Sequence, residues 1–382
     1  LSGLVGSEMC IRDRLDKDEI KKITEEIANK NYKNIAINSV YSPLNSEMEL
    51  EANEIIKNII PDANISLSHS IGKVGLIERE NATIINAALA NLAVEIVESF
   101  KNALKKLNID APLYISQNDG TLMRPDKVKQ YPVLTFACGP TNSMRGAAYL
   151  SGIQDSIIVD IGGTTSDVGY IKAGFPRQSA IATDVGGVRT NFRMPDIISI
   201  GLGGGSLIRD NGNKVGPDSV GYRLTEKALV FGGDTLTATD IAVKHYDLDI
   251  GDKSLLNKLD DSTVKNAKQE ITRLLEEAVD KMKTSAENVP AVFVGGGTIL
   301  NKENLDALKL PEELPRNFPT IARTVLLASK PDVQSHDLQL LQDQSALCML
   351  GRALPQRTHC YPLVVLVPRD APYQSVILLL SL

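Results

Sequence analysis

The chain has 382 residues, of which 43% are hydrophobic, and this is enough for two or more α/β domains that each bury a core. The formal net charge of -6 and the lack of a Lys/Arg-rich run exclude the basic surface that nucleic acids or anionic membranes require. The four cysteines are too scattered for a disulfide scaffold or a zinc site, which favours the cytoplasm. No uninterrupted run of about 18 apolar residues is present, so we expect no membrane span.

Two terminal segments differ from the rest of the chain. Residues 1–14 have no apolar period and lack the basic start of a signal peptide, so we interpret them as a non-native leader. Residues 318–382 contain no Asn or Glu and a single Lys, Lys330, whereas the preceding chain is rich in all three. We expect an aberrant tail produced by a frameshift or a chimeric end, and the alternative is a natural C-terminal domain of different composition.

The first part of the chain alternates between helical and extended patterns. Lys17–Asn29 has the period of an amphipathic helix and Asn34–Val40 that of a strand. Ser46 followed by Glu49 has the spacing of a capping box, which predicts that a second helix starts there. Further on we expect a helix over Thr83–Leu107 and strands over Pro112–Ser116 and Val133–Phe136.

The second part contains the most apolar strand of the chain. Ser156–Ile161 is expected to be a central strand, buried on both faces, that ends at a ligand-facing turn. Val168–Ile171 resumes the extended pattern, Leu255–Met282 predicts a long helix with a break near Asp261, and Ala291–Val294 predicts another buried strand. We place one lobe at residues 15–150 and a second lobe, which carries the ligand-facing turn, at residues 151–317.

The segment Asp160–Asp167 (DIGGTTSD) connects two predicted strands and is rich in groups that bind phosphate. Glycines at 162 and 163 let backbone N–H groups approach an anion, and the hydroxyls that follow add donors. The acids at its two ends suit Mg²⁺, which prefers a few carboxylates and several waters. A hairpin whose Asp and Thr residues only stabilise turns is the alternative, but it would not need both acids and three hydroxyls.

Two further glycine clusters, Ser199–Ser206 and Gly295–Thr298, are each more typical of a tight turn than of a ligand site. Together with the turn at Asp160, they predict a nucleotide held between two lobes, with its phosphates at the hairpins.

The ordered set of motifs resembles the hydantoinase/oxoprolinase family of the actin-like and sugar-kinase-like ATPase superfamily. The turn at Asp160–Asp167 is similar to the family's second phosphate motif. The resemblance runs from about Ile35 to Thr298 and includes these further segments: 41–47 (YSPLNSE), 68–70 (SHS), 78–80 (ERE), 116–120 (SQNDG), 139–140 (GP), 201–206 (GLGGGS), 215–219 (VGPDS) and 237–240 (TATD).

This resemblance implies an α/β fold with ribonuclease-H-like lobes, mixed sheets and flanking helices. It implies ATP and Mg²⁺ as cofactors and ATP-driven opening of a cyclic amide or imide, such as a hydantoin or 5-oxoproline, or else ATP-dependent carboxylation of a ketone. The residues it singles out are Asp160 and Asp167 as catalytic and metal-binding groups; Gly162, Gly163, Thr164, Thr165, Gly203, Gly204, Gly205, Gly295, Gly296 and Gly297 for the nucleotide; and Ser68, His69, Glu78, Arg79 and Asn118 for the substrate.

The chain departs from the family pattern at several points. The family's first phosphate motif is missing ahead of Lys17, from which we expect the isolated chain to hydrolyse ATP poorly. Cys138–Met144 replaces a Ser-Gly-Pro-Ala-Ala-Gly pattern, and Tyr222–Gly233 lacks family elements, which indicates a divergent subgroup. The small-residue helix expected after Gly297 is not recognisable. The resemblance also implies an oligomer and a second hydantoinase-type subunit as partner.

Several of these residues have simpler interpretations. His69 could be a hydrogen-bonded loop residue, one of Asp234 and Asp240 could cap a helix, and Cys138 could be an inert buried thiol. Two other functions remain open for the chain as a whole: a non-catalytic nucleotide-binding subunit and an inactive truncated gene product.

Overall fold

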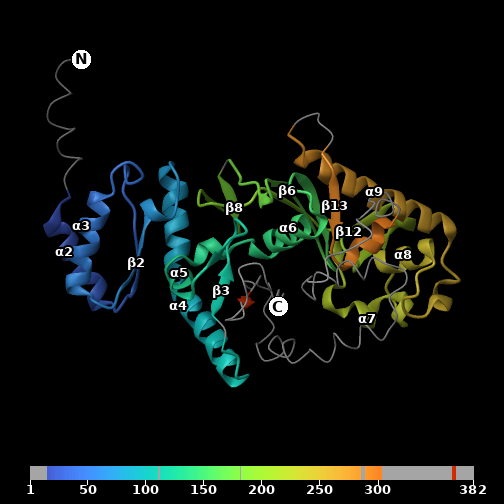
Figure 1. Cartoon of the computed structure of the whole chain (residues 1–382), viewed down its shortest axis with the longest axis horizontal. Coiled ribbons are helices and arrows are strands. Elements are labelled where there is room, and N and C mark those ends of the chain that lie inside the picture. Colours follow the sequence, from blue (N-terminus) through green and yellow to red (C-terminus); the bar gives the residue numbers. More distant parts are fainter. Residues whose placement is uncertain (1–14, 111, 181, 285–288, 303–363, 367–382) are drawn as a thin grey trace, which may run out of the picture. The chain divides into compact units, whose positions relative to one another are not determined.

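The structure is a computed structural model, and it describes residues 15–110, 112–180, 182–284, 289–302 and 364–366. Its elements belong to two units: unit 1 contains residues 1–136 and 178–194, and unit 2 contains residues 137–177 and 195–382 (Figure 1). The leader 1–14 and nearly all of the tail 318–382 lie outside the described residues.

Unit 1 is built on a pair of parallel strands, β1 (Asn34–Ile37) and β2 (Asn64–Leu67). Because side chains alternate along a strand, Ile35 can point inward, where it packs with Ile56 of a neighbouring helix. The elements of this unit are α2 (Lys17–Asn29), α3 (Glu47–Ile59), η1 (Ser68–Ser70), α4 (Leu76–Lys106), β3 (Leu113–Ser116), β4 (Leu122–Met123), α5 (Pro125–Gln130), η2 (Pro132–Thr135), β8 (Thr183–Val185) and β9 (Val188–Thr190).

Helix α4 packs against both β1 and β2. Among the described residues it is the one helix whose length and composition would allow it to cross a membrane, and 33% of its most apolar window is buried. A core helix of an α/β unit passes the same criterion, so the absence of a membrane span stays a prediction.

Unit 2 contains a five-stranded sheet in the order β10-β6-β5-β13, with β7 paired to β6. The central strand β5 runs parallel to β13 and antiparallel to β6. The elements are α6 (Cys138–Ser151), β5 (Ser156–Ile161), β6 (Ser166–Lys172), β7 (Phe175–Pro176), β10 (Ile197–Ile200), β11 (Ser206–Arg209), η3 (Asp210–Gly212), β12 (Lys214–Ser219), η4 (Gly221–Arg223), α7 (Leu224–Lys227), η5 (Leu229–Phe231), α8 (Ala238–Tyr246), η6 (Lys253–Leu256), α9 (Asp261–Met282), β13 (Ala291–Val294), η7 (Gly296–Asn301) and β14 (Val364–Leu366).

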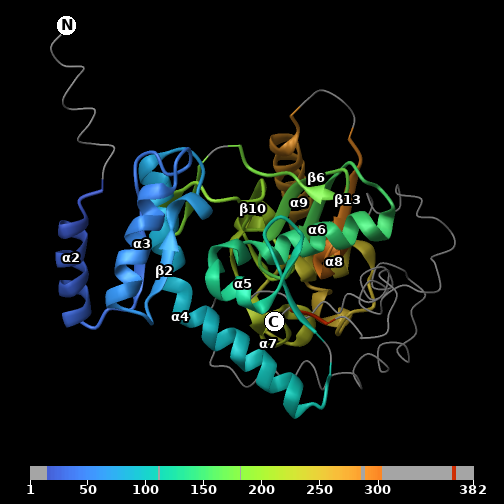
Figure 2. The same cartoon turned by 60° about the vertical axis from the view of Figure 1, so that its left-hand side comes forward.

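Strand β5 is covered by helices on both faces, as its continuous apolar run predicts. Ile158 packs with Met144 and Ala148 of α6, whereas Ile157 and its alternating partners pack with α9. Because successive side chains point to opposite faces of a sheet, α6 and α9 cover opposite faces (Figure 2). The far end of β5, at Asp160, is thereby held between two packed layers.

Two predicted features are wrong. Residues 133–136 form no strand, because residues 133–135 belong to the short helix η2 and Phe136 is its C-cap. Helix η2 starts at Pro132, and proline suits the first turn of a helix. Ser46 and Glu49 form no capping box, since the Ser46 side chain caps nothing and Glu49 turns instead toward Ser68 and His69.

Candidate nucleotide site

The turn between β5 and β6 presents its backbone and hydroxyls to solvent. Gly162 N–H donates to the Thr165 carbonyl at 2.9 Å, which closes the turn. Gly163, Thr164 and Thr165 are exposed, and the hydroxyls of the two threonines form no hydrogen bond with another described residue. A tight turn with free N–H and O–H donors is an arrangement that accepts phosphate oxygens.

The glycine loop between β10 and β11 lies against the back of this turn. Gly204 N–H donates to the Gly162 carbonyl at 3.0 Å, and Gly205 N–H donates to the Gly163 carbonyl at 2.7 Å. A Cβ at Gly203 would lie 2.6 Å from the Thr164 nitrogen. The N–H groups of Gly204 and Gly205 are thus occupied within the protein, and these glycines shape the turn from behind through close backbone approach.

The third glycine cluster also reaches the turn. Gly295, with a φ of +90° that favours glycine, has no room for a side chain because a Cβ would collide with the Asp160 carboxylate. A Cβ at Gly297 would lie 2.7 Å from the Gly162 carbonyl oxygen, whereas Gly296 faces open space. The structure therefore brings all three predicted glycine clusters together at one place.

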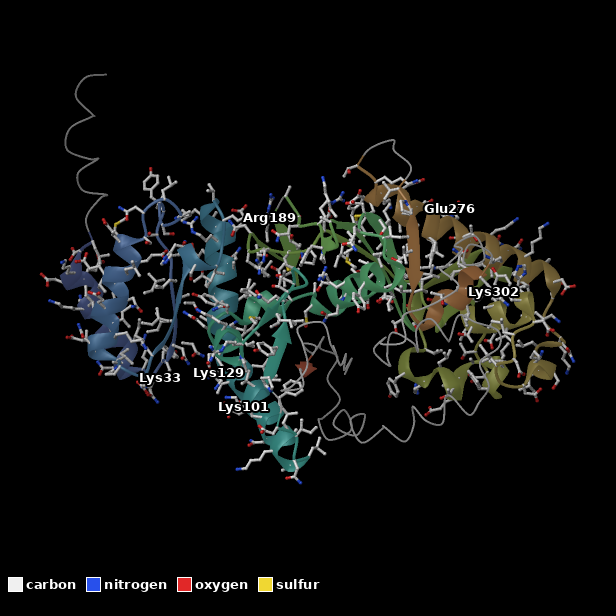
Figure 3. All side chains as sticks on the ribbon, viewed as in Figure 1. Lys33, Lys101, Lys129, Arg189, Glu276 and Lys302 are labelled. Carbon is white, nitrogen blue, oxygen red and sulfur yellow. The ribbon has the colours of Figure 1, made fainter. Side chains whose placement is uncertain are left out.

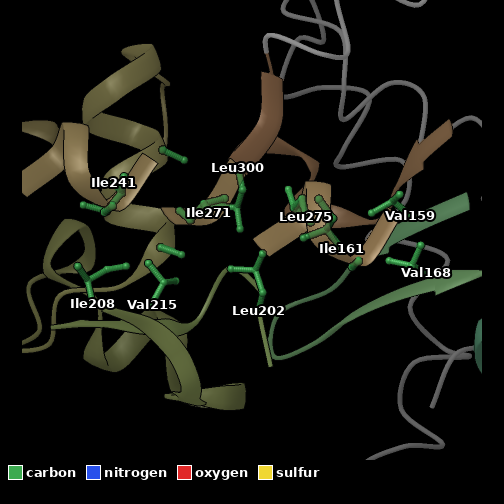
Figure 4. Packing of buried hydrophobic residues seen from close by; sticks show 14 of the residues in the cluster. Val159, Ile161, Val168, Leu202, Ile208, Val215, Ile241, Ile271, Leu275 and Leu300 are labelled. Carbon is green, nitrogen blue, oxygen red and sulfur yellow. The ribbon is translucent and has the colours of Figure 1, made fainter. Parts of the chain in front are cut away.

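Apolar side chains next to these glycines hold the three segments in position. Ile161 precedes the turn, Leu202 lies in the second loop, and Leu300 lies in η7 after the third cluster. All three are buried at 0–1% exposure in one hydrophobic cluster (Figure 4). Ser166 at the end of the turn donates to the Leu202 carbonyl at 2.6 Å, which ties the first two segments further.

Asp160 and Asp167 are neighbours across the β5–β6 ladder. Burial raises the pKa of Asp160, against the opposing effect of a hydrogen bond from Ser143. Burial also raises the pKa of Asp167, with a lowering hydrogen bond from Ser199 and a further rise from the charge of Asp160. Within the described residues neither acid has an ion-pair partner, so a cation would relieve both.

The two acids fit Mg²⁺ bound together with a nucleotide. The described part of the chain contains no cluster of three or more His, Cys, Asp or Glu side chains that could hold a metal ion alone. Mg²⁺ that accompanies phosphates needs only one or two carboxylates, since phosphate oxygens and waters supply its other ligands.

A second polar cluster in unit 1 joins three of the predicted substrate residues. Glu49, on α3, accepts hydrogen bonds from Ser68 Oγ at 2.5 Å and from His69 Nδ1 at 2.7 Å. Arg79 Nε donates to Ser68 Oγ at 3.0 Å, and Ser42 Oγ lies 2.8 Å from the same oxygen. Glu49 and Ser42 were not predicted as site residues from the sequence, because the spacing of Ser46 and Glu49 suggested a helix cap.

Arg79 holds this cluster together through hydrogen bonds to Ser68 and to backbone carbonyls of neighbouring loops. Its side chain is 1% exposed, and Nη1 donates to the carbonyls of Lys73 and Gly75 while Nη2 donates to those of Ser39 and Val40. With the Nε bond to Ser68, all five N–H donors have acceptors in the protein. Arg79 therefore fixes the loops around His69 and has no donor left for a ligand.

The remaining predicted substrate residues lie elsewhere in unit 1. Glu78, in the first turn of α4, is 3.5 Å from the guanidinium of Arg189, which is labelled in Figure 3. Asn118 is buried and donates through Nδ2 to the Arg193 carbonyl, and its Oδ1 has no partner among the described residues. The structure thus groups Ser68, His69 and Arg79 but not these two.

The simpler interpretations account for two other residues. Asp240 caps α8: it accepts hydrogen bonds from the backbone and hydroxyl of Thr237 and is fully buried. Asp234 is exposed beside Thr235. Cys138 is a buried cysteine at the start of α6.

The fold defines a class of protein: an α/β protein with mixed sheets and flanking helices, a fold that it shares with solved structures. The hydantoinase/oxoprolinase family model matches residues 79–296, more than half of the chain. The chain therefore belongs to the hydantoinase/oxoprolinase family. The family's N-terminal region matches residues 4–60, and this match begins inside the segment 1–14 that our sequence analysis set aside.

Characterised and uncharacterised relatives share this family. The chain is 28% identical over 244 residues to an uncharacterized protein of Methanocaldococcus jannaschii, covering 59% of this chain and 36% of that protein. It is 24% identical to the acetophenone carboxylase gamma subunit of Aromatoleum aromaticum (60% and 33%) and 25% identical to the caprolactamase subunit alpha of Pseudomonas jessenii (59% and 33%). The chain thus spans about a third of the length of these relatives.

Among solved structures, the ATP-dependent caprolactamase of Pseudomonas jessenii has the same fold. The TM-score is 0.65 at 18% identity, and the match covers 94% of this chain and 61% of that chain.

Proposed function

We propose that the chain is part of an ATP-dependent enzyme that opens a cyclic amide or imide. The observation that carries this proposal is the convergence of three glycine clusters on the turn Gly162–Thr165, beside two half-buried carboxylates without a cationic partner among the described residues. Such a site has donors for phosphate and acceptors for a metal, and nothing else in the described chain neutralises the acids.

In this proposal the turn binds the terminal phosphates of ATP. The exposed N–H groups of Gly163 and Thr164 and the hydroxyls of Thr164 and Thr165 are the donors. The donors are preorganised because the second glycine loop bonds to the turn from behind, and preorganised donors stabilise transferring phosphate without reorganisation. Asp160 and Asp167 would hold Mg²⁺ or its waters, and the ion would supply charge neutralisation at the phosphates.

ATP is needed in this reaction because an amide is difficult to hydrolyse directly. An amide carbonyl is unreactive and its nitrogen is a poor leaving group, so hydrolysis near neutral pH is slow. Transfer of the γ-phosphoryl group from ATP to the carbonyl oxygen releases ADP and makes the carbonyl carbon electrophilic. Water can then attack this carbon, the ring C–N bond breaks, and hydrolysis of the resulting acyl phosphate releases inorganic phosphate. In this proposal, residues of the turn orient the phosphoryl group for transfer.

One relative supports the opening of a cyclic amide, and another supports the rival reaction, the carboxylation of a ketone. The caprolactamase relative is named for a lactam, which is a cyclic amide, whereas the acetophenone carboxylase relative is named for a ketone. Both reactions can begin with phosphorylation of an oxygen. We favour the cyclic amide, and we propose a partner subunit and an oligomer, because both relatives are named as subunits. We also propose a cytoplasmic location, because the four cysteines are too scattered for a disulfide scaffold.

The test measures ATP-dependent product release by the protein together with its partner subunit. Hydantoin, N-methylhydantoin, 5-oxoproline and caprolactam are offered one at a time, and ketone plus bicarbonate is the competing reaction. We expect ADP formation to match ring opening for at least one cyclic amide. ADP formation that responds only to ketone and bicarbonate would replace our proposal with a carboxylase, and nucleotide binding without any turnover would indicate a non-catalytic subunit.

A further inference from the structure

Both carboxylate oxygens of Glu49, in unit 1, accept hydrogen bonds from neighbouring groups. Oε1 accepts from Ser68 Oγ at 2.5 Å and from Ser39 N–H at 3.0 Å. Oε2 accepts from His69 N–H at 3.1 Å and lies 2.7 Å from His69 Nδ1. The backbone and the ring of one histidine therefore meet the same oxygen, which fixes both the position of His69 and the orientation of its imidazole.

Glu49 remains ionised in this environment. Burial acts to raise its pKa, but hydrogen bonds from Ser68, His69 and Ser42 outweigh burial and hold the pKa below its usual range. An ionised carboxylate only accepts hydrogen bonds, so the proton between Glu49 and His69 belongs to Nδ1. In the neutral ring, Nε2 is then a proton acceptor.

His69 is the one member of this cluster that combines a free functional atom with access to solvent. Its side chain is 23% exposed, and Nε2 has no partner within the described residues. Ser42 and Ser68 are buried. Arg79, the cationic group that contacts the cluster through Ser68, has no donor left. A loop tie alone would not need an imidazole oriented by a buried carboxylate.

We propose that His69 is the proton-transfer residue for ring opening and that Glu49 is its positioning residue. This inference rests on the proposed function. His69 Nε2 takes a proton from water as the water oxygen forms a bond to the ring carbonyl carbon. The ring C–N bond then breaks, and the proton passes from Nε2 to the leaving nitrogen, so histidine is unchanged at the end of this step. The carbonyl carbon is left as an acyl phosphate, which a second water hydrolyses to the carboxylate and inorganic phosphate. The Nδ1–H bond to Glu49 stabilises the imidazolium that forms between the two steps.

The first experiment needs no substrate. ¹⁵N NMR of the histidine-labelled protein, with His69→Asn to assign the signal, reports which ring nitrogen carries the proton. We expect Nδ1–H in the parent and a loss of this fixed tautomer in Glu49→Gln. An Nε2–H ring in the parent would overturn the inference, whatever the enzyme's activity.

The second experiment measures single-turnover ring opening with the cyclic amide that the preceding assay identifies. His69→Ala is expected to lower the rate roughly 10²–10⁴-fold, and added imidazole is expected to restore part of it. Rescue by imidazole separates proton transfer from a purely structural role. Ser70→Ala, an exposed neighbour on the same turn whose Oγ bonds only the Leu67 carbonyl, is the matched control and should keep the parental rate.

The outcomes separate this inference from the proposed function. A protein that opens the ring at the parental rate with His69→Ala retains the proposed function and overturns the inference. A loss without imidazole rescue, at unchanged thermal stability, also overturns it. A protein that opens no cyclic amide at all overturns the proposed function, and the proton-transfer role with it.

Discussion

Gly203 lies so close to the backbone of Thr164 that a Cβ at position 203 would be 2.6 Å from the Thr164 nitrogen. Both partners are backbone, so the contact cannot relax by rotation of a side chain. Gly203→Ala is therefore expected to destabilise unit 2 by about 1–3 kcal/mol, as overpacking does. Gly146→Ala, inside α6 with nothing within 4 Å of the new Cβ, is the control and should stabilise by about 1 kcal/mol. Thermal unfolding measures both, and equal melting temperatures would contradict the close approach.

Asp160 is predicted to reduce stability at neutral pH, because burial raises its pKa. Its folded-state pKa lies above the unfolded value, so stability is highest in acid and falls as pH rises through that window. Asp160→Asn removes the buried charge and should raise the melting temperature at neutral pH, while the gain should fade once both states are protonated. If Asp160→Asn lowered the melting temperature equally at acidic and at neutral pH, this account would be contradicted.

Thr164→Val tests whether the exposed hydroxyl contributes to turnover. The side chain is exposed and forms no hydrogen bond with another described residue, so unfolding should be unchanged, whereas ATP turnover by the complete enzyme should lose about 2–4 kcal/mol of transition-state stabilisation. Thr225→Val, also exposed in unit 2, is the control. Parental turnover in Thr164→Val would remove the hydroxyl from the site.

Glu49→Gln is expected to destabilise unit 1 by about 2 kcal/mol at neutral pH, since hydrogen bonds to a buried charged group are lost. The pKa of Glu49 is depressed in the folded state, so its contribution is present above the unfolded pKa and is lost as pH falls through the folded pKa. Denaturant unfolding at several pH values should show the parent and the variant converge in acid. A difference that does not depend on pH would indicate loss of packing alone.

The strands of the ATPase-type sheet could be predicted because their apolar runs are continuous. Ser156–Ile161 and Ala291–Val294 form β5 and β13 with the predicted bounds. Helix α4 begins at Leu76, seven residues before the predicted start at Thr83. The prediction missed this first part because Leu76 and Ile77 are apolar but exposed, so they do not follow the helical period of buried residues. Local pattern therefore located the elements that are buried on all sides and lost accuracy where an end is exposed.

The candidate site could be predicted only in its parts. The glycine clusters were each visible in the sequence, but their convergence depends on carbonyls of Gly162 and Gly163 that accept N–H groups some 40 residues away along the chain. Glu49 was misread because its nearest sequence neighbour, Ser46, suggested a local partner, whereas its actual partners, Ser68 and His69, come from another segment. Interactions between distant segments leave no periodic trace in a sequence.

Gly163→Ala tests the central claim, that the turn binds the phosphates of ATP, most directly. A Cβ at Gly163 meets nothing within 4 Å, so the protein itself does not need glycine at this position, and only an approaching ligand would. Thermal unfolding measures whether folding needs glycine at position 163, and calorimetric titration of the protein with Mg-ATP measures whether ligand binding needs it. We predict an unchanged melting temperature and binding weakened by at least about tenfold, or about 1.4 kcal/mol. Equal affinity for Mg-ATP in the parent and the variant would contradict the claim.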